Sequence, residues 1–142
     1  MLDKSKIIEK QIKNLHSRSL PDEIAIQIFK LGKPAYDYLF TTIDNPTLTD
    51  YQVINLLRLL YMMRYHGNLD AFVNKLLFLI QDDRIKVRSV ASIMSVNLLR
   101  IAETFNYLNI PLQREKLISF LENALIMELD SASTQVVQDF LE

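Results

Sequence analysis

The stretch QDDRIKVRSVASIMSVNLL, residues 81–99, gives the strongest indication of the fold. Asp82-Asp83 follows Gln81 at its start, and carboxylates favour the positively polarised start of a helix. Apolar residues then recur at one-turn intervals on one helical face: Val87, Val90, Ala91, Met94, Leu98, Ile101 and Phe105. Ile93, Val96 and Leu99 point to other sides of the same helix. A helix that is apolar on more than one side indicates packing against several neighbouring helices rather than a place in a simple amphipathic bundle.

Capping and helix-breaking residues along the rest of the chain predict eight helices and no strand. Ser19 is expected to cap the second helix ahead of Pro21, and Gly32 to end it. Thr49 and Gln52 have the spacing of a capping box at the start of the fourth helix. The expected helices cover about residues 3–16, 19–32, 34–45, 49–65, 69–80, 82–105, 111–130 and 131–142. Because the loops are short, consecutive helices should pair as antiparallel hairpins. Tyr38 and Leu39 of the third helix are expected to face the core.

The composition is typical of one ordinary domain, which we expect to cover residues 1–142. The chain has two glycines and four prolines, and this scarcity of turn residues favours helices over an all-β fold. Sixteen basic residues balance seventeen acidic ones, so bulk charge gives no support for binding to nucleic acid or to an anionic membrane. Cysteine is absent, which excludes disulfides, thiolate metal sites and cysteine nucleophiles. Without a signal peptide or a spanning apolar stretch, we expect a soluble, cytoplasmic protein.

Segment 31–99 resembles the HEAT-repeat family of armadillo-like α-solenoids. In that family the turn between paired helices carries an Asp, followed by a Val-Arg pair and an Ala, and here Asp82, Val87, Arg88 and Ala91 match that pattern. The resemblance implies an all-α fold in which antiparallel hairpins stack as a short right-handed solenoid. It also implies that Asp82 and Arg88 form hydrogen bonds that hold successive turns in register. A further implication is that the second helices line a concave surface that binds other macromolecules.

Residues of the types that perform catalysis or bind metals are few and are scattered along the sequence. His16 and His66 lie near predicted helix ends, where a cationic side chain is favourable, and they are fifty positions apart in the sequence. The adjacent carboxylates Asp82-Asp83 do not face each other on a helix. The sequence contains no nucleophile motif, no Gly-rich phosphate loop and no zinc-protease motif. We therefore expect no enzymatic activity, no cofactor and no metal.

Tyr, Arg and Met residues lie on the face of the fourth helix opposite its core, and these residue types are enriched at protein interfaces. The second helix of the next hairpin adds small residues that leave room for a partner. We predict that an unidentified protein contacts this second-helix surface, which comprises Tyr51, Asn55, Arg58, Met62, Tyr65, Ser92, Val96 and Arg100. The alternative is that Met62 and Tyr65 pack on adjacent helices. The predicted function is a non-catalytic protein–protein interaction module: an adaptor, an assembly factor or an inhibitor.

Other functions stay open. Basic residues of the second helices would form a track for nucleic acid if the chain acted like the DNA glycosylases of the alkylation-repeat type, although tryptophan and excess positive charge are missing. Some HEAT-like proteins are lyases for phycobilisome chromophores, and no residue here selects that branch. A small helical enzyme would need a deep polar pocket around Glu103 or His66. Solenoids need polar capping repeats, so we also expect either further repeats or homo-oligomers through exposed solenoid ends.

Overall fold

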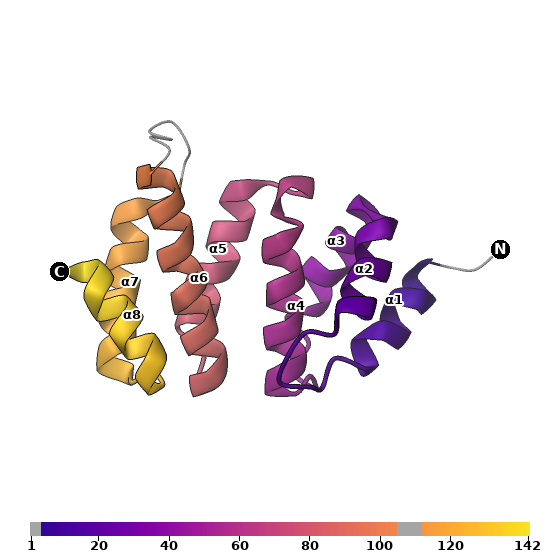
Figure 1. Ribbon diagram of the computed structural model, residues 1–142, viewed down its shortest axis with the longest axis horizontal. Helices are drawn as coiled ribbons and strands as arrows, with labels where there is room; N and C mark the ends of the chain where they lie inside the picture. Colours follow the sequence, from indigo (N-terminus) through magenta and orange to yellow (C-terminus); the bar gives the residue numbers. More distant parts are fainter. Residues whose placement is uncertain (1–3, 105–111) are drawn as a thin grey trace. The chain divides into compact units, whose positions relative to one another are not determined.

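The structure is a computed structural model that describes residues 4–104 and 112–142, and these residues form an all-α fold (Figure 1). Their regular structure is eight α-helices and one short 3-10 helix, so the predicted all-α class and number of helices are confirmed. The elements are α1 (Lys4–Lys13), α2 (Asp22–Leu31), α3 (Lys33–Thr42), α4 (Asp50–Met62), η1 (Arg64–His66), α5 (Leu69–Ile80), α6 (Ile85–Thr104), α7 (Arg114–Met127) and α8 (Ser131–Leu141). None of these helices is both long and apolar enough to cross a membrane.

The predicted capping box at the start of α4 is present. The Thr49 hydroxyl oxygen accepts a hydrogen bond from the Gln52 backbone N–H at 3.2 Å, and Gln52 Oε1 accepts one from the Thr49 N–H at 2.9 Å. Two backbone donors that lack helical partners are thereby satisfied. The sequence signal and the structure agree at this position.

Asp130 sets the boundary between α7 and α8. Its carboxylate accepts a hydrogen bond from the Ser133 N–H at 2.8 Å, which makes it the N-cap of α8. Its own N–H donates to the Ser89 hydroxyl oxygen of α6 at 3.0 Å. Because Asp130 begins the next helix, α7 ends at Met127 and not near residue 130 as predicted.

The start of α2 corrects a second boundary prediction. Ser19 does not cap the helix: Pro21 occupies the N-cap without a side-chain hydrogen bond, and the Ser19 carbonyl accepts one from the Ser17 hydroxyl at 2.8 Å. Proline fixes the backbone φ at this point, so the helix begins without a hydroxyl cap. Gly32 ends α2 as predicted, with a φ of 66°, a left-handed value that favours glycine.

The remaining helix ends fall close to the predictions. α1 ends at Lys13 and not near residue 16, because the next two backbone amides donate to carbonyls three residues earlier and tighten the last turn. α4 ends at Met62, and η1 continues the segment predicted to be helical. α5 has the predicted bounds. The predicted helix end at 105 and helix start at 111 lie outside the described residues.

The chain divides into two compact units, residues 1–68 and 69–142, and each is described by itself. In unit 1, α1 packs against α2, α3 and α4, and α3 also contacts α2, α4 and η1. Its core includes Ile8, Ile12, Leu15, Ile28, Leu39 and Ile43. Tyr36 is buried on α3, whereas Tyr38, which was predicted to face inward, is only half-buried. The expectation of a single domain over 1–142 stays a prediction.

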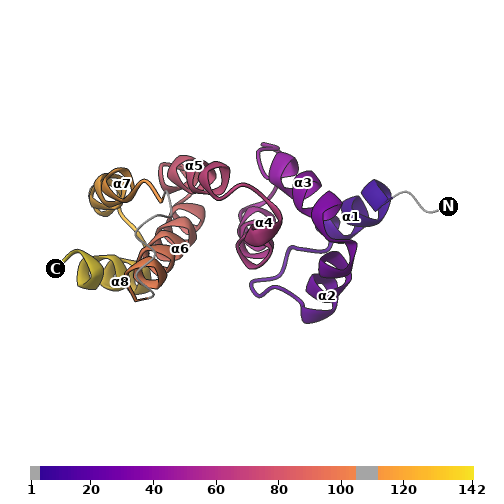
Figure 2. The same cartoon turned by 90° about the horizontal axis from the view of Figure 1, so that it is seen from above.

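Unit 2 consists of two hairpins, α5–α6 and α7–α8, arranged in two layers. α5 lies beside α7 and α6 lies beside α8, as the view from above shows (Figure 2). α6 contacts all three other helices of the unit, and its buried apolar side chains lie on more than one side, as predicted. They are Val87, Ala91, Met94, Val96, Leu98 and Leu99.

Candidate partner-binding surface

The side of α4 that is predicted to bind a partner changes from buried to exposed toward its C-terminal end. Tyr51 and Arg58 are half-buried and Asn55 is 0% exposed. Met62 is 48% exposed, and Tyr65, in η1, is 77% exposed. Of the predicted residues in unit 1, Met62 and Tyr65 offer the largest apolar surface to a partner.

Asn55 and Arg58 form hydrogen bonds within unit 1. Asn55 Nδ2 donates to the carbonyls of Leu15 at 3.0 Å and Ser17 at 2.8 Å. Arg58 donates to the Arg18 carbonyl and to Asn55 Oδ1, both at 2.9 Å. The carbonyls at and beyond a helix C-terminus lack helical partners, so these donors hold the loop that follows α1. The prediction that Asn55 contacts a partner is therefore corrected, because its side chain is buried and fully used here.

Burial lowers the pKa of the Arg58 guanidinium from its ordinary value, and the charge of Tyr51 raises it in opposition. The ordinary value lies so far above neutrality that the group stays protonated. Arg58 therefore acts as a fixed donor to the loop carbonyls and not as a titrating group.

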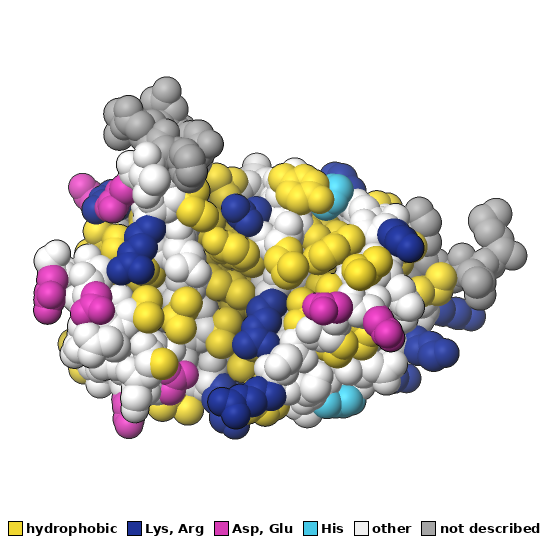
Figure 3. All heavy atoms as spheres, viewed as in Figure 1, with side chains coloured by type: hydrophobic (Ala, Val, Ile, Leu, Met, Phe, Trp, Pro, Cys, Tyr) yellow, Lys and Arg dark blue, Asp and Glu magenta, His cyan; other side chains and the backbone are white. Residues whose placement is uncertain are grey.

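The C-terminal end of α4 and η1 carry a mixed aromatic and cationic surface, which we call the α4-end cluster: Tyr61, Met62, Arg64, Tyr65 and His66. The ring centroids of Tyr65 and His66 lie 4.4 Å apart. The Arg64 guanidinium lies 4.4 Å from the centroid of the Tyr61 ring and donates to the Tyr61 carbonyl at 2.8 Å. Hydrophobic and histidine side chains lie together over the upper end of α4 (Figure 3). These contacts limit the motion of the rings while Met62 and Tyr65 stay exposed.

Tyr36 of α3 supports the backbone that follows the cluster. A side chain at position 67 would collide with the Tyr36 ring, so the chain approaches the ring this closely only because Gly67 has no Cβ. The Tyr36 hydroxyl is buried and has no hydrogen-bond partner among the described residues. Burial, and secondarily the charge of Asp37, raises its pKa. The sequence identifies Gly67 as a glycine that follows a helix end. It does not indicate that the Tyr36 ring packs against this glycine.

Most of the contact residues predicted in unit 2 are buried. Ser92 and Val96 are both 0% exposed, so the prediction that they contact a partner is corrected. The Ser92 hydroxyl donates to the Arg88 carbonyl one turn earlier at 2.8 Å, so it needs no partner outside the helix. Arg100 is exposed, with its guanidinium 5.8 Å from the centroid of the Phe140 ring. Of the three residues predicted in this unit, Arg100 alone offers its side chain to a partner.

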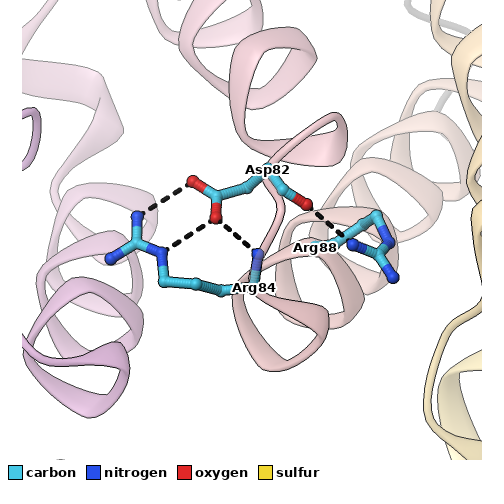
Figure 4. A network of polar contacts seen from close by, with 3 residues as sticks. All are labelled: Asp82, Arg84 and Arg88. Carbon is cyan, nitrogen blue, oxygen red and sulfur yellow. Dashed lines mark hydrogen bonds and ion pairs between the residues drawn. The ribbon is translucent and has the colours of Figure 1, made fainter.

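Arg88 connects two turns of unit 2, the first of which Figure 4 shows. Its guanidinium donates to the Asp82 carbonyl at 2.7 Å and to the carbonyls of Met127 at 3.2 Å and Glu128 at 2.5 Å. The Asp82 carboxylate instead pairs with Arg84, whose Nε lies 2.8 Å from it. The contact between Asp82 and Arg88 that the HEAT resemblance implies is thus made through the backbone oxygen of Asp82.

The pKa of the Asp82 carboxyl lies below its ordinary value. Burial alone would raise it, but hydrogen bonds from the side chain and backbone of Arg84 favour the ionised form. The positive charges of Arg84 and Arg88 act in the same direction. The ionised Asp82 carboxylate therefore stabilises the turn between α5 and α6 through its contacts with Arg84.

The candidate catalytic and metal-binding residues show no convergence. Within residues 4–104 and 112–142, no group of three or more His, Asp or Glu residues is placed to hold a metal ion. His16 is exposed, and His66 is half-buried against Tyr65. Glu103 forms an exposed ion pair with Arg114 at 2.6 Å.

Comparisons with known proteins add no family assignment. No protein-family model matches the chain. Neither a curated protein nor a solved structure matches it significantly. Function is therefore inferred from the residues of this chain alone.

Proposed function

We propose that the chain is a non-catalytic protein-interaction module that binds its partner through the α4-end cluster. The observation that carries this proposal is the exposure of Met62 and Tyr65, at 48% and 77%. Fully burying an apolar side chain of this size contributes about 1.5–3 kcal/mol. Since a few residues carry most of the energy of an interface, two such side chains close together would form its central anchor.

The two anchors have complementary properties. The Tyr65 ring already rests against His66, so binding restricts it less than it would restrict a free side chain. Met62 is unbranched and polarizable, and such a side chain adapts to an irregular surface. A rigid aromatic ring beside an adaptable thioether is a common composition for a binding surface.

The charges beside the anchors indicate the chemistry of the partner. Arg64 is held over Tyr61, which orients its guanidinium before a partner arrives. His66 adds a second nitrogen-bearing group on the same short segment. We infer that the partner presents an apolar side chain flanked by a carboxylate.

The architecture that we infer is a HEAT-like α-solenoid in which this cluster lies on a second helix. The two stacked hairpins of unit 2 support this, and so do the hydrogen bonds from Arg88 to two successive inter-helix turns. The proposed role is that of an adaptor, an assembly factor or an inhibitor in the cytoplasm.

Photo-crosslinking tests the proposal. A photoreactive amino acid replaces Tyr65 in one variant and Phe78 in a matched control, because Phe78 of unit 2 is also exposed, at 66%. In host lysate we expect a crosslinked protein from position 65 and none from position 78. With that protein purified, Tyr65→Ala should weaken binding by about 30-fold, which corresponds to the loss of one interface anchor.

The control for the affinity measurement is Phe78→Ala, which should bind like the wild type. Circular dichroism establishes that both variants are folded. Crosslinks of equal yield from both positions, or equal affinities of the two alanine variants, would place the binding surface elsewhere.

A further inference from the structure

The helix α7 carries an exposed stripe on the side away from the core of unit 2. Glu115, Glu122 and Ile126, which we call the α7 stripe, are exposed and share one side of the helix by their spacing. The opposite side carries the buried Leu117 and Leu121. Ile126 is 84% exposed, more than any other large apolar side chain of the described residues. Ile126 lies one turn after Glu122, and a large exposed apolar side chain beside a carboxylate is a feature of interaction surfaces.

The helix α1 of unit 1 carries the opposite charge. Lys6, Lys10 and Lys13, which we call the α1 stripe, are exposed and share one side of the helix. Ile8 and Ile12 on the other side are buried in the core of the unit. Within the described residues, none of the three lysines forms an ion pair. The charge of this stripe is therefore available to an anionic partner.

The two stripes match in spacing as well as in charge. Lys6 and Lys13 are separated by the same number of residues as Glu115 and Glu122, about 10.5 Å along a helix. Residues 6–31 contain five basic and three acidic residues, whereas residues 114–142 contain two basic and six acidic ones. Basic side chains gather around α1 of unit 1, and acidic ones lie around α8 on the visible face of unit 2 (Figure 3).

We propose that copies of this chain associate head to tail, with the α1 stripe of one copy against the α7 stripe of the next. Each copy carries both stripes, so every chain supplies a complementary surface to its neighbour. The contact is heterologous, and it therefore extends with concentration unless the rotation between copies closes a ring. It uses neither Met62 nor Tyr65 and does not depend on the proposed partner site.

Charge complementarity favours a second copy as the occupant. A nucleic acid would be attracted to the α1 stripe but repelled by the carboxylates of the α7 stripe, and it would leave Ile126 in water. A second copy places an α7 stripe against an α1 stripe, so each contact between copies pairs lysines with carboxylates and covers Ile126. Exposed ion pairs contribute little individually, so the association is weak and depends on salt.

A charge-swap experiment tests the contact by sedimentation velocity at low ionic strength. One variant carries Lys6→Glu/Lys13→Glu and the other Glu115→Lys/Glu122→Lys. Each alone should remain monomeric at concentrations where the wild type associates, with dissociation constants raised at least about tenfold. Mixed together, they should associate again, because the acidic α1 of the first variant matches the basic α7 of the second.

Two controls complete the experiment. Arg18→Glu/Lys30→Glu changes the net charge equally but lies off the α1 stripe, and it should weaken association much less than Lys6→Glu/Lys13→Glu does. Ile126→Ser should weaken association without changing charge, while circular dichroism shows that it is folded. A wild-type chain that stays monomeric at all concentrations overturns the proposal, and so does a mixture that does not associate.

Discussion

In both units, polar side chains of one helix donate hydrogen bonds to backbone carbonyls at or beyond the end of another helix. The two units use different side chains to do so. In unit 1, α4 supplies Asn55 and Arg58 to the carbonyls that follow α1. In unit 2, α6 supplies Arg88 to the carbonyls at the end of α7. Unit 1 divides the donors between a buried amide and a half-buried guanidinium, whereas unit 2 relies on one guanidinium that is 5% exposed. The comparison shows that the carbonyls at a helix end determine where polar residues are buried, whichever donor is used.

The two units also differ in whether the acceptor carbonyls come before or after the donor in the sequence. Arg58 reaches back to a loop forty residues earlier, and Arg88 reaches forward to a turn forty residues later. In both units the donor lies on a helix whose other sides are occupied by apolar packing. A buried donor without its acceptors, or the reverse, costs about 1–3 kcal/mol and more when charged. The units should therefore differ in how much a single substitution destabilises them.

The largest expected effect is that of Arg88→Ala. It leaves the carbonyls of Asp82 and Glu128 without a donor in a partly buried setting, and we expect the free energy of unfolding to fall by about 3 kcal/mol. Urea unfolding followed by circular dichroism measures it. The exposed Arg100 of the same helix provides the matched control, since Arg100→Ala should cost less than about 1 kcal/mol. Equal losses for both variants would mean that Arg88 does not connect the two turns.

Asn55→Ala should follow, with a loss of about 2 kcal/mol. The carbonyls of Leu15 and Ser17 lose their donor, but no buried charge is removed. Asn97 on α6 is exposed, so Asn97→Ala tests the same chemical change without burial and should be nearly neutral. If Asn55→Ala lowered the free energy of unfolding by more than Arg88→Ala, unit 1 and not unit 2 would be the more sensitive to the loss of one donor.

Arg58→Ala should cost about 1 kcal/mol, because its guanidinium is half-exposed and water can replace it at the Arg18 carbonyl. Thermal unfolding resolves a difference of this size. Combining it with Asn55→Ala sharpens the comparison: the two side chains contact each other, so their effects should not be additive. Strict additivity would indicate two independent contacts.

The smallest effect is the dependence on pH that Asp82 gives to the stability of unit 2. The pKa of Asp82 is lower in the folded state than in the unfolded chain, so its contribution is complete above the unfolded value, about 3.9, and is lost as pH falls through the folded value. Asp82→Asn should therefore flatten the decline of stability below about pH 4. Stability is measured by urea unfolding across this range. Parallel pH profiles for the variant and the wild type would exclude Asp82 as the source.

Local sequence signals predicted the helices well but not their surroundings. The capping box at Thr49 and the bounds of α5 depend on residues close in sequence, and the structure confirms them. Periodicity identified one side of α4 and of α6 as polar or small. It did not reveal that Asn55 and Ser92 are buried there, because their acceptors are backbone carbonyls.

For the candidate site, the sequence predicted the exposed residues but not the contacts that orient them. Met62 and Tyr65 were identified from residue type and helical spacing, and both are exposed. The contacts that orient the cluster, such as Arg64 over Tyr61, depend on the turn from α4 into η1. A sequence that predicts one continuous helix to residue 65 gives no indication of that turn.

The hydrogen bond from the Asp130 N–H to Ser89 has a consequence for hydrogen exchange. Amides in loops ordinarily exchange by small local openings, while amides of packed helices require larger ones. Since the acceptor lies on α6, the Asp130 amide loses this partner when α8 separates from that helix. This backbone position between two helices should thus exchange more slowly than a turn amide that has only water as its partner, and Ser89→Ala should remove the difference.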